Sequence, residues 1–299
     1  MLDSRIKVFY EVAKTLSFTK AANALFISQP AVTKHIQALE NEFGLPLFIR
    51  KGNRIYLTSA GKDLFYYAEQ VEKLHQNLND RFNLYRNEKS GELKIGASTT
   101  IAQYVLPSIL AAFKNKYPNI NIYLTTGNSE LIANNLIKNE IDLGLVEGRV
   151  KNHDLKYEIF LQDELTLVTS SKNKSSTANE ITIEQLKKLP LVLRERGSGT
   201  LEVFEYELKK HKIKLNDLNI VMYLGSTEAI KNYIANSNAY GVISVQAIKK
   251  ELENNSLISI KAKHLKVVRT FDFISLQGSP ISNLTYLFKK FAKQYYNKK

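Results

Sequence analysis

Gln29, Thr33 and Lys34 have the side-chain types and the spacing needed to read the edges of DNA bases. They are predicted to project from the N-terminal half of one short helix, because the apolar residues around them recur at helical spacing on its other side. That half of a recognition helix reaches base edges in the major groove. The alternative is an ordinary helical hairpin with a solvated polar face, and the flanking sequence decides between the two interpretations.

Two short helices joined by a tight turn are predicted over residues 18–40. We predict Thr19 as the N-cap of the first helix and Ser28 as the N-cap of the second. Pro30 then lies in the first turn of the second helix, where a missing N–H costs nothing. Apolar residues follow helical spacing on each side of the turn: Ala21, Ala22, Leu25, Ile27, Val32, Ile36 and Leu39.

A third helix and a β-hairpin complete a winged helix-turn-helix. Residues 2–16 are predicted to form an amphipathic helix that covers the apolar face of the first two. Two strand-favouring runs within residues 45–58 flank a glycine- and asparagine-containing turn at 51–54. Three cations at this turn suit a wing that lies along phosphates or enters a minor groove. The predicted DNA-binding residues are Thr19, Lys20, Ser28, Gln29, Pro30, Thr33, Lys34, Arg50, Lys51 and Arg54.

The first 61 residues resemble the LysR-type bacterial transcriptional regulators. The resemblance implies promoter DNA as a partner, RNA polymerase as a candidate partner, and a tetramer built from two kinds of interface. It also implies a C-terminal pair of lobes like those of periplasmic binding proteins. The matching residues are Ser17-Phe-Thr-Lys-Ala-Ala, Ser28-Gln-Pro-Ala-Val-Thr, Leu39-Glu, Leu47-Phe48 with Arg50, Leu57-Thr, and Ala60-Gly61.

The composition excludes several classes of protein. The chain has 299 residues and no cysteine, so neither a disulfide nor a thiolate metal site is expected, and its five histidines have no pair at metal-ligand spacing. No segment matches a signal peptide or the roughly 20 apolar residues of a membrane span. We expect a cytoplasmic protein with no metal, no cofactor and no membrane partner. Most of the net charge of +13 lies after residue 90, where it indicates either an anionic ligand or a lysine-rich solvated surface.

A long helix from residue 59 to about 88 is expected to pair with the same helix of a second subunit. Its apolar residues follow one another at steps of three and four, which produces a stripe too narrow to be covered by a sequence neighbour. The alternative is packing on its own C-terminal domain. Either a homodimer or a homotetramer would present two recognition helices to two half-sites. The predicted dimerisation residues are Leu64, Tyr67, Val71, Leu74 and Leu78.

Strands and helices alternate from Leu93 onward, which predicts parallel sheets in two lobes rather than one large sheet. We divide the chain into a winged helix-turn-helix domain (1–58), a linker helix (59–90) and an α/β effector domain (91–299). Lobe I takes about 91–162 and 267–299, and lobe II about 163–266. The strands that cross between the lobes are placed near 160–163 and 266–270.

Three segments at predicted strand ends carry hydroxyls and glycines suited to an anion: 97–100, 194–200 and 225–228. The alternative is that each Ser or Thr only caps its own helix. The resemblance implies that residues 98–100 contact the inducer, that 194–200 is similar to the segment of sulfur and carbon-fixation regulators, and that 146–148 borders the same cleft. The predicted effector residues are Ser98, Thr99, Thr100, Glu147, Gly148, Arg196, Ser198, Gly199, Thr200, Ser226 and Thr227.

No arrangement of residues indicates catalysis, since Glu147 and Glu228 are single carboxylates without a partner in the sequence. The sequence therefore predicts a DNA-binding transcriptional regulator modulated by a small anionic effector bound between two lobes. Two alternatives remain: a regulator with a vestigial cleft that needs no ligand, and, more remotely, the solute-binding protein of a transporter.

Overall fold

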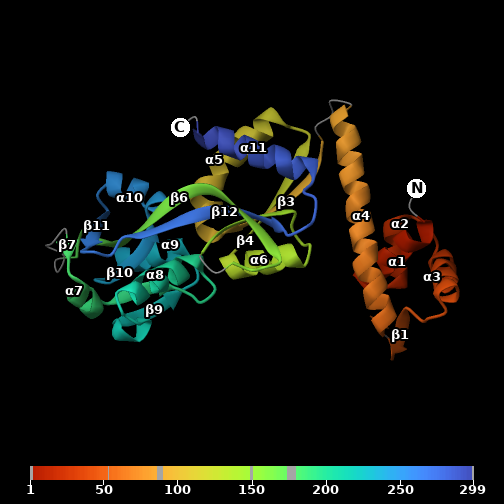
Figure 1. Ribbon diagram of the computed structural model, residues 1–299, viewed down its shortest axis with the longest axis horizontal. Helices are drawn as coiled ribbons and strands as arrows, with labels where there is room; N and C mark the ends of the chain where they lie inside the picture. The colour runs from red at the N-terminus through yellow and green to blue at the C-terminus, as the bar shows by residue number, and fades with distance from the viewer. Residues whose placement is uncertain (1–2, 53, 86–89, 149–150, 174–179, 298–299) are drawn as a thin grey trace. The chain divides into compact units, whose positions relative to one another are not determined.

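The computed structural model describes residues 3–52, 54–85, 90–148, 151–173 and 180–297 (Figure 1). The chain divides into two compact units, Met1–Glu88 and Lys89–Lys299, and each has hydrophobic cores of its own. Within the described ranges, none of the helices combines the length and the apolar composition that crossing a bilayer requires.

Three helices form the body of the N-terminal unit: α1 (Ser4–Thr15), α2 (Phe18–Leu25) and α3 (Gln29–Phe43). Their apolar faces meet in one core, in which Phe9, Val12 and Val32 are fully buried. The hydrophobic spacing of the sequence predicted these helices correctly. Asn53, in the predicted wing turn, lies outside the described residues.

The N-cap of α2 is Ser17, so the prediction of Thr19 as that cap is wrong. Ser17 has extended backbone, and its Oγ accepts a hydrogen bond of 3.2 Å from the backbone N–H of Lys20, whereas Thr19 lies within the helix. The prediction for α3 is confirmed, because Ser28 Oγ accepts from the N–H of Ala31 at 3.4 Å and proline follows in the first turn.

The wing is an antiparallel pair of strands, β1 (Phe48–Lys51) and β2 (Arg54–Leu57). Glu40 of α3 holds the start of the wing, since its carboxylate accepts from the backbone N–H of Leu47 at 2.7 Å. The long helix α4 (Ser59–Tyr85) follows. Gly61 in its first turn lets α4 approach the wing, because a Cβ there would lie 2.1 Å from the carbonyl oxygen of Leu47.

The first lobe of the C-terminal unit contains three parallel strands, β3 (Gly91–Ser98), β4 (Ile120–Gly127) and β5 (Leu143–Glu147). A π-helical turn, η1 (Ile101–Val105), leads into α5 (Leu106–Lys116). The other helices of this lobe are α6 (Ser129–Ile137) and α11 (Asn283–Asn297).

The second lobe repeats this plan with the parallel strands β8 (Leu191–Arg194), β9 (Ile220–Leu224) and β10 (Tyr240–Ser244). Two further strands, β7 (Glu180–Ile181) and β11 (Leu257–Ala262), pair with each other beside them. The remaining elements of this lobe are α7 (Ile183–Lys188), α8 (Gly199–Lys210), α9 (Thr227–Ala235) and α10 (Lys249–Glu253), with 3-10 turns η2 (Leu215–Asp217) and η3 (Val245–Ala247).

Two long strands, β6 (Leu155–Ser170) and β12 (Val267–Leu276), run antiparallel through both lobes (Figure 1). Because β12 pairs along its whole length with residues 155–165 of β6, while β12 also pairs with β5 and β6 with β10, one sheet continues through both lobes, in the order β4-β3-β5-β12-β6-β10-β8-β9. The two expected lobes are confirmed, each with its own core, but their strands form one continuous sheet rather than two, because the crossing strands join the two sets of parallel strands. In β6, Phe160 packs in the core of the first lobe and Leu165 in the core of the second. In β12, Phe271 packs in the first core and Val267 in the second, so each strand crosses between the lobes within these few residues.

Candidate DNA-binding surface and effector site

The predicted base-reading side chains lie together on the solvent side of α3. Gln29 and Lys34 are exposed and Thr33 is half-buried. Gln29 Nε2 donates to Thr33 Oγ1 at 3.0 Å, and that hydroxyl donates to the Gln29 carbonyl at 3.2 Å. The amide is therefore oriented before any base is bound. Thr19, Lys20, Ser28 and Pro30 are also exposed, on α2 and at the start of α3.

Arg50, Lys51 and Arg54 are exposed at the tip of the wing, where Lys51 and Arg54 are direct cross-strand partners. None of the three forms an ion pair within the described part of the chain, so their charges are available to phosphates. The turn between α2 and α3 also presents Phe26, which is 95% exposed and was not predicted as a site residue. The sequence signal for Phe26 was that this apolar residue does not fall on the face of α2 that packs in the core.

The apolar stripe of α4 divides into two parts. Leu64 packs against the core of the N-terminal unit and belongs to that fold. Tyr67, Val71, Leu74 and Leu78 are exposed, with Leu74 at 58%. Phe82, in line with them, is also exposed.

The C-terminal ends of the neighbouring strands β3 and β5 bring Ser98 and Glu147 together, and both side chains are buried. Ser98 Oγ donates a hydrogen bond to Glu147 Oε2. The backbone of Glu147 is enclosed as well: its carbonyl oxygen accepts from Ser129 Oγ at 2.6 Å, and a Cβ at Gly199 would lie 1.9 Å from it. Gly199 therefore permits the start of α8 in the second lobe to lie directly on the end of β5 in the first.

Arg269 of β12 lies at the junction of the two lobes and was not predicted. Its side chain is fully buried, and its Nε donates to Asp163 Oδ2 of β6 at 2.7 Å. Its Nη1 donates to Thr200 Oγ1 of α8 at 2.8 Å and lies 3.6 Å from Glu147 Oε1. Ser244 Oγ donates to the other oxygen of Asp163 at 2.7 Å. One guanidinium thus joins both crossing strands, the end of β5 and the start of α8.

Three buried hydrogen-bonding groups at this junction have no partner among the described residues: Thr100 Oγ1, Ser198 Oγ and Arg269 Nη2. Such groups are rare in folded proteins, because an unpaired buried donor costs about 1–3 kcal/mol. Thr100 and Ser198 occupy N-cap positions, yet neither side chain makes a capping hydrogen bond. The interpretation that each hydroxyl only caps its own helix therefore fails for these two residues.

The other predicted hydroxyls have partners of their own. Ser226 caps α9 by accepting from the N–H of Ala229 at 3.1 Å, and Thr227 is buried behind it in the first turn of that helix. Thr99 Oγ1 accepts from Arg194 Nη1 at 2.9 Å, which is a contact between the lobes. Gly148 has a φ of +146°, a conformation that favours glycine, and lies against Glu202 of α8.

Arg196 does not join this group, contrary to the prediction. Its side chain is 72% exposed and its Nη1 pairs with Glu205 at 2.9 Å on the surface of the second lobe. The buried arginine of the segment is Arg194, which is held by Glu195 at 2.8 Å and by Thr99. Arg194 ends β8, so its side chain points toward the other lobe, whereas Arg196 lies in the loop that follows.

A second contact between the lobes involves Tyr104 of η1 and Glu228 of α9. The tyrosine hydroxyl donates to the Glu228 carboxylate, and Lys231 pairs with Glu228 at 2.8 Å and lies 5.0 Å from the tyrosine ring centroid. Burial and the hydrogen bond to Glu228 raise the pKa of Tyr104. Burial alone would raise the pKa of Glu228, but hydrogen bonds from Lys231 and Tyr104 outweigh it and lower that pKa below its ordinary value. The π-helical turn places Tyr104 for this contact, as such turns often do at functional sites.

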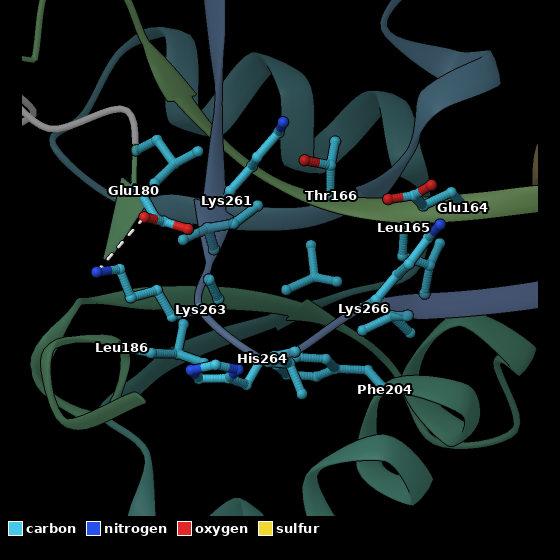
Figure 2. Close-up of a pocket in the computed structure, with 16 residues that line it drawn as sticks. Glu164, Leu165, Thr166, Glu180, Leu186, Phe204, Lys261, Lys263, His264 and Lys266 are labelled. Carbon is cyan, nitrogen blue, oxygen red and sulfur yellow. Dashed lines mark ion pairs between the residues drawn. The ribbon is translucent and has the colours of Figure 1, made fainter. Parts of the chain in front are cut away.

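A cavity of about 620 Å³ lies in the second lobe, between β6, β11 and α8 (Figure 2). Figure 2 shows Leu186 and Phe204 on one side of it and the lysines 261 and 266 on the other. Lys263 at its edge pairs with Glu180 at 3.6 Å. None of the predicted effector residues lines it, and none of the unpartnered buried atoms named above belongs to its lining. The unsatisfied donors thus mark the junction of the lobes rather than this cavity.

Two family models cover nearly the whole chain. Residues 4–62 match "Bacterial regulatory helix-turn-helix protein, lysR family", and residues 86–297 match "LysR substrate binding domain". The chain is 31% identical over 276 residues to a "Probable RuBisCO transcriptional regulator" of Thalassiosira pseudonana, which covers 91% of this chain and 90% of that protein. It is 30% identical over 269 residues to the "HTH-type transcriptional regulator CysL" of Bacillus subtilis (strain 168), with 90% and 89% covered.

Among solved structures, the regulatory domain of Synechocystis PCC6803 CcmR in complex with 2-PG matches with a TM-score of 0.63 and 27% identity. The match covers 69% of this chain and 97% of that one. Both matching models and the relatives above describe transcriptional regulators and not enzymes. The chain therefore belongs to the LysR family of bacterial transcriptional regulators, whose members combine a DNA-binding helix-turn-helix with an effector-binding domain.

Proposed function

We propose that this regulator senses a small anion held between the two lobes of its C-terminal unit, by Thr100 and Ser198 together with Arg269. The observation that carries the proposal is that the free hydrogen-bonding group of each of these three buried side chains has no partner among the described residues. One comes from the first lobe, one from the second and one from a crossing strand. An anion is the ligand that hydroxyl and guanidinium donors in an enclosed site bind best.

The comparisons support an anion without identifying it. CcmR of Synechocystis has been solved with 2-PG, and its regulatory domain shares this fold at 27% identity. The similarity of 194–200 to sulfur and carbon-fixation regulators is consistent with relatives named CysL and RuBisCO transcriptional regulator. We propose that the effector of this chain is a small oxyacid anion of comparable charge.

The effector acts, in this proposal, by changing the relative populations of two arrangements of the lobes. The three donor atoms are buried when the lobes contact each other through Arg194–Thr99 and Tyr104–Glu228. The lobes must therefore part for the anion to enter, and an anion that satisfies the donors stabilises the joined arrangement. This change would alter the spacing and bend of the DNA that the paired winged helices hold.

We propose that the exposed side chains of α3 and of the wing bind the promoter DNA. Gln29, Thr33 and Lys34 read bases from α3, and the wing cations contact backbone or minor groove. The protein acts in the cytoplasm, where its promoters are. Two copies pair through the exposed part of the α4 stripe, which consists of Tyr67, Val71, Leu74 and Leu78. We divide the chain into a DNA-binding domain (1–58), a linker helix (59–90) and an effector domain (91–299).

The free edges of the C-terminal sheet support a second contact between copies. β4 and β9 end the path of paired strands, and both carry exposed apolar side chains. These are Tyr123 and Leu124 on β4, and Val221, Met222 and Tyr223 on β9. Because exposed apolar edge strands can pair with another chain, we propose that a second copy covers them. A helix pair and a sheet-edge pair together would give a homotetramer.

Calorimetric titration of the full-length protein tests the anion proposal. 2-PG, inorganic phosphate and sulfate are added to the wild type and to Ser198→Ala. We expect at least one anion to bind the wild type and to bind Ser198→Ala about ten-fold more weakly, because one charge-assisted hydrogen bond is lost. Binding of none of them would favour the alternative of a regulator with a vestigial cleft. Membership of the regulator family removes the alternative of a transporter's solute-binding protein.

A further inference from the structure

Glu147 is a buried carboxylate beside Arg269 and the start of α8, which supply two of the three proposed donors. It lies beside Ser98, 3.6 Å from Arg269 Nη1, and in contact with Gly199, the residue after Ser198. Its side chain is 1% exposed. An anion bound by Arg269 and Ser198 would therefore lie close to a second negative charge.

The positive charge of Arg269 is neutralised without Glu147. Arg269 is already paired with Asp163 at 2.7 Å through a direct hydrogen bond. The 3.6 Å between Arg269 Nη1 and Glu147 Oε1 exceeds the length of a hydrogen bond, so this contact is only a weak ionic one. One guanidinium thus faces two buried carboxylates, and an added anion without a proton would increase the excess of negative charge in a low dielectric.

A ligand that carries a hydrogen-bond donor removes this conflict. A hydroxyl or an acid proton directed at Glu147 forms a charge-assisted hydrogen bond with the carboxylate, which can only accept. The same ligand can accept at its anionic end from Arg269 Nη2, Thr100 and Ser198. Donor and acceptor groups of ligand and protein are then complementary on both sides.

We infer that Glu147 is a specificity-determining residue that selects small anions bearing a hydroxyl or a retained acid proton, and rejects anions that only accept hydrogen bonds. The effector class is thus a hydroxy acid or a hydrogen oxyanion. This inference rests on the proposed function, because it describes the same site between the lobes.

Two pairs of probe anions that differ in the donor test the inference on the full-length protein. Glycolate and acetate differ by one hydroxyl. Inorganic phosphate at about pH 6 retains protons, whereas the tetrahedral sulfate ion has none. Each probe is titrated by calorimetry into the wild type, Glu147→Gln and Glu158→Gln. Glu158 is the matched control, since it pairs with Lys289 at 2.6 Å on α11 and is not among the effector residues.

The wild type and Glu158→Gln are expected to prefer glycolate over acetate, and phosphate over sulfate, by about ten-fold or more. In Glu147→Gln the amide can itself donate and carries no charge, so sulfate and acetate should gain affinity and both preferences should disappear.

Equal binding within both pairs by the wild type, or preferences that persist in Glu147→Gln, would overturn the inference while leaving the anion site in place. If none of the four probes bound either the wild type or Glu147→Gln, the proposed function itself would be contradicted together with the inference. A circular dichroism spectrum and an unfolding curve for each variant show whether it is folded.

Discussion

Tyr104 in the first lobe donates its hydroxyl hydrogen to the carboxylate of Glu228 in the second lobe, so the two lobes are joined by a tyrosine–carboxylate hydrogen bond. Lys231 supports the carboxylate from the same helix and also pairs with Glu251 at 2.6 Å. The contact lies beside Thr99 and Thr100, which precede the same π-helical turn. Stability of the joined lobes and occupancy of the anion site should therefore be linked.

This contact predicts a specific dependence of stability on pH. The lowered pKa of Glu228 contributes stability at pH values above its unfolded-state value near 4.5, and that stability is lost as the pH falls through the folded-state pKa. Tyr104→Phe removes one of the two donors, so the folded-state pKa of Glu228 should rise toward 4.5 and the acid limb of the stability profile should move to higher pH. Urea unfolding of both proteins at a series of pH values measures this shift. Superimposed acid limbs would show that the tyrosine does not stabilise the charged carboxylate.

For Asp272 we predict the opposite dependence of stability on pH. This residue of β12 is buried, its Oδ1 has no partner among the described residues, and burial raises its pKa above 3.8. A raised carboxyl pKa means that the native state loses stability as the pH rises from 3.8 through the folded-state value. Asp272→Asn should therefore be more stable than the wild type at neutral pH, with a gain that vanishes in strong acid. A thermal-unfolding series across pH that showed equal or lower stability of the variant at pH 7 would contradict this.

Recognition of DNA should depend on Gln29 more than on a second glutamine of the same helix. Gln29→Ala should cost about 1–3 kcal/mol on the operator and relax specificity at one base pair. Gln37, exposed in the C-terminal half of α3, provides the control substitution Gln37→Ala. Arg54→Ala in the wing should weaken all sequences alike and reduce the salt slope by about 1. Fluorescence anisotropy with operator and scrambled DNA separates these effects; unchanged selectivity in Gln29→Ala would mean that the recognition surface lies elsewhere.

Assembly should fail when charges enter the exposed α4 stripe. Val71→Glu with Leu74→Glu places unpaired charges in an apolar contact, and operator affinity should fall by about 10² as the bivalent gain is lost. His75→Glu, an exposed position beside Leu74, is the control for added charge on this helix. Sedimentation velocity reports the oligomeric state. A double variant that sediments like the wild type and keeps full operator affinity would show that the stripe is not the pairing surface.

The sequence predicts local structure well where residues close together in the chain determine it. The apolar spacing of α3, Ser28 as its cap and the alternation of strands and helices all describe short-range physics. Thr19 and Ser17 are both good caps, and only the extended backbone at Ser17 distinguishes them. The continuous sheet was missed because antiparallel pairing of β6 with β12 joins residues more than 100 positions apart.

The candidate site could be predicted only in part for the same reason. Thr100 and Ser198 were found because hydroxyls at strand ends are a local signal. Arg269 was not, because its contacts Glu147, Asp163 and Thr200 come from three other segments. A charged residue within the apolar strand Val267–Leu276 was the available signal. The choice of Arg196 over Arg194 depended on the direction of the chain after β8, which spacing does not determine.

Anion-dependent operator binding by the wild type and Thr100→Val tests the central claim most directly. The variant keeps the shape of the threonine and deletes its hydroxyl, and Thr126→Val on exposed β4 is the matched control. An anion that binds in calorimetry should change the operator footprint of the wild type and the control. Thr100→Val should need about ten-fold more anion for the same change, with unchanged DNA binding in its absence. An anion response identical in Thr100→Val and the wild type would contradict an effector site between the lobes.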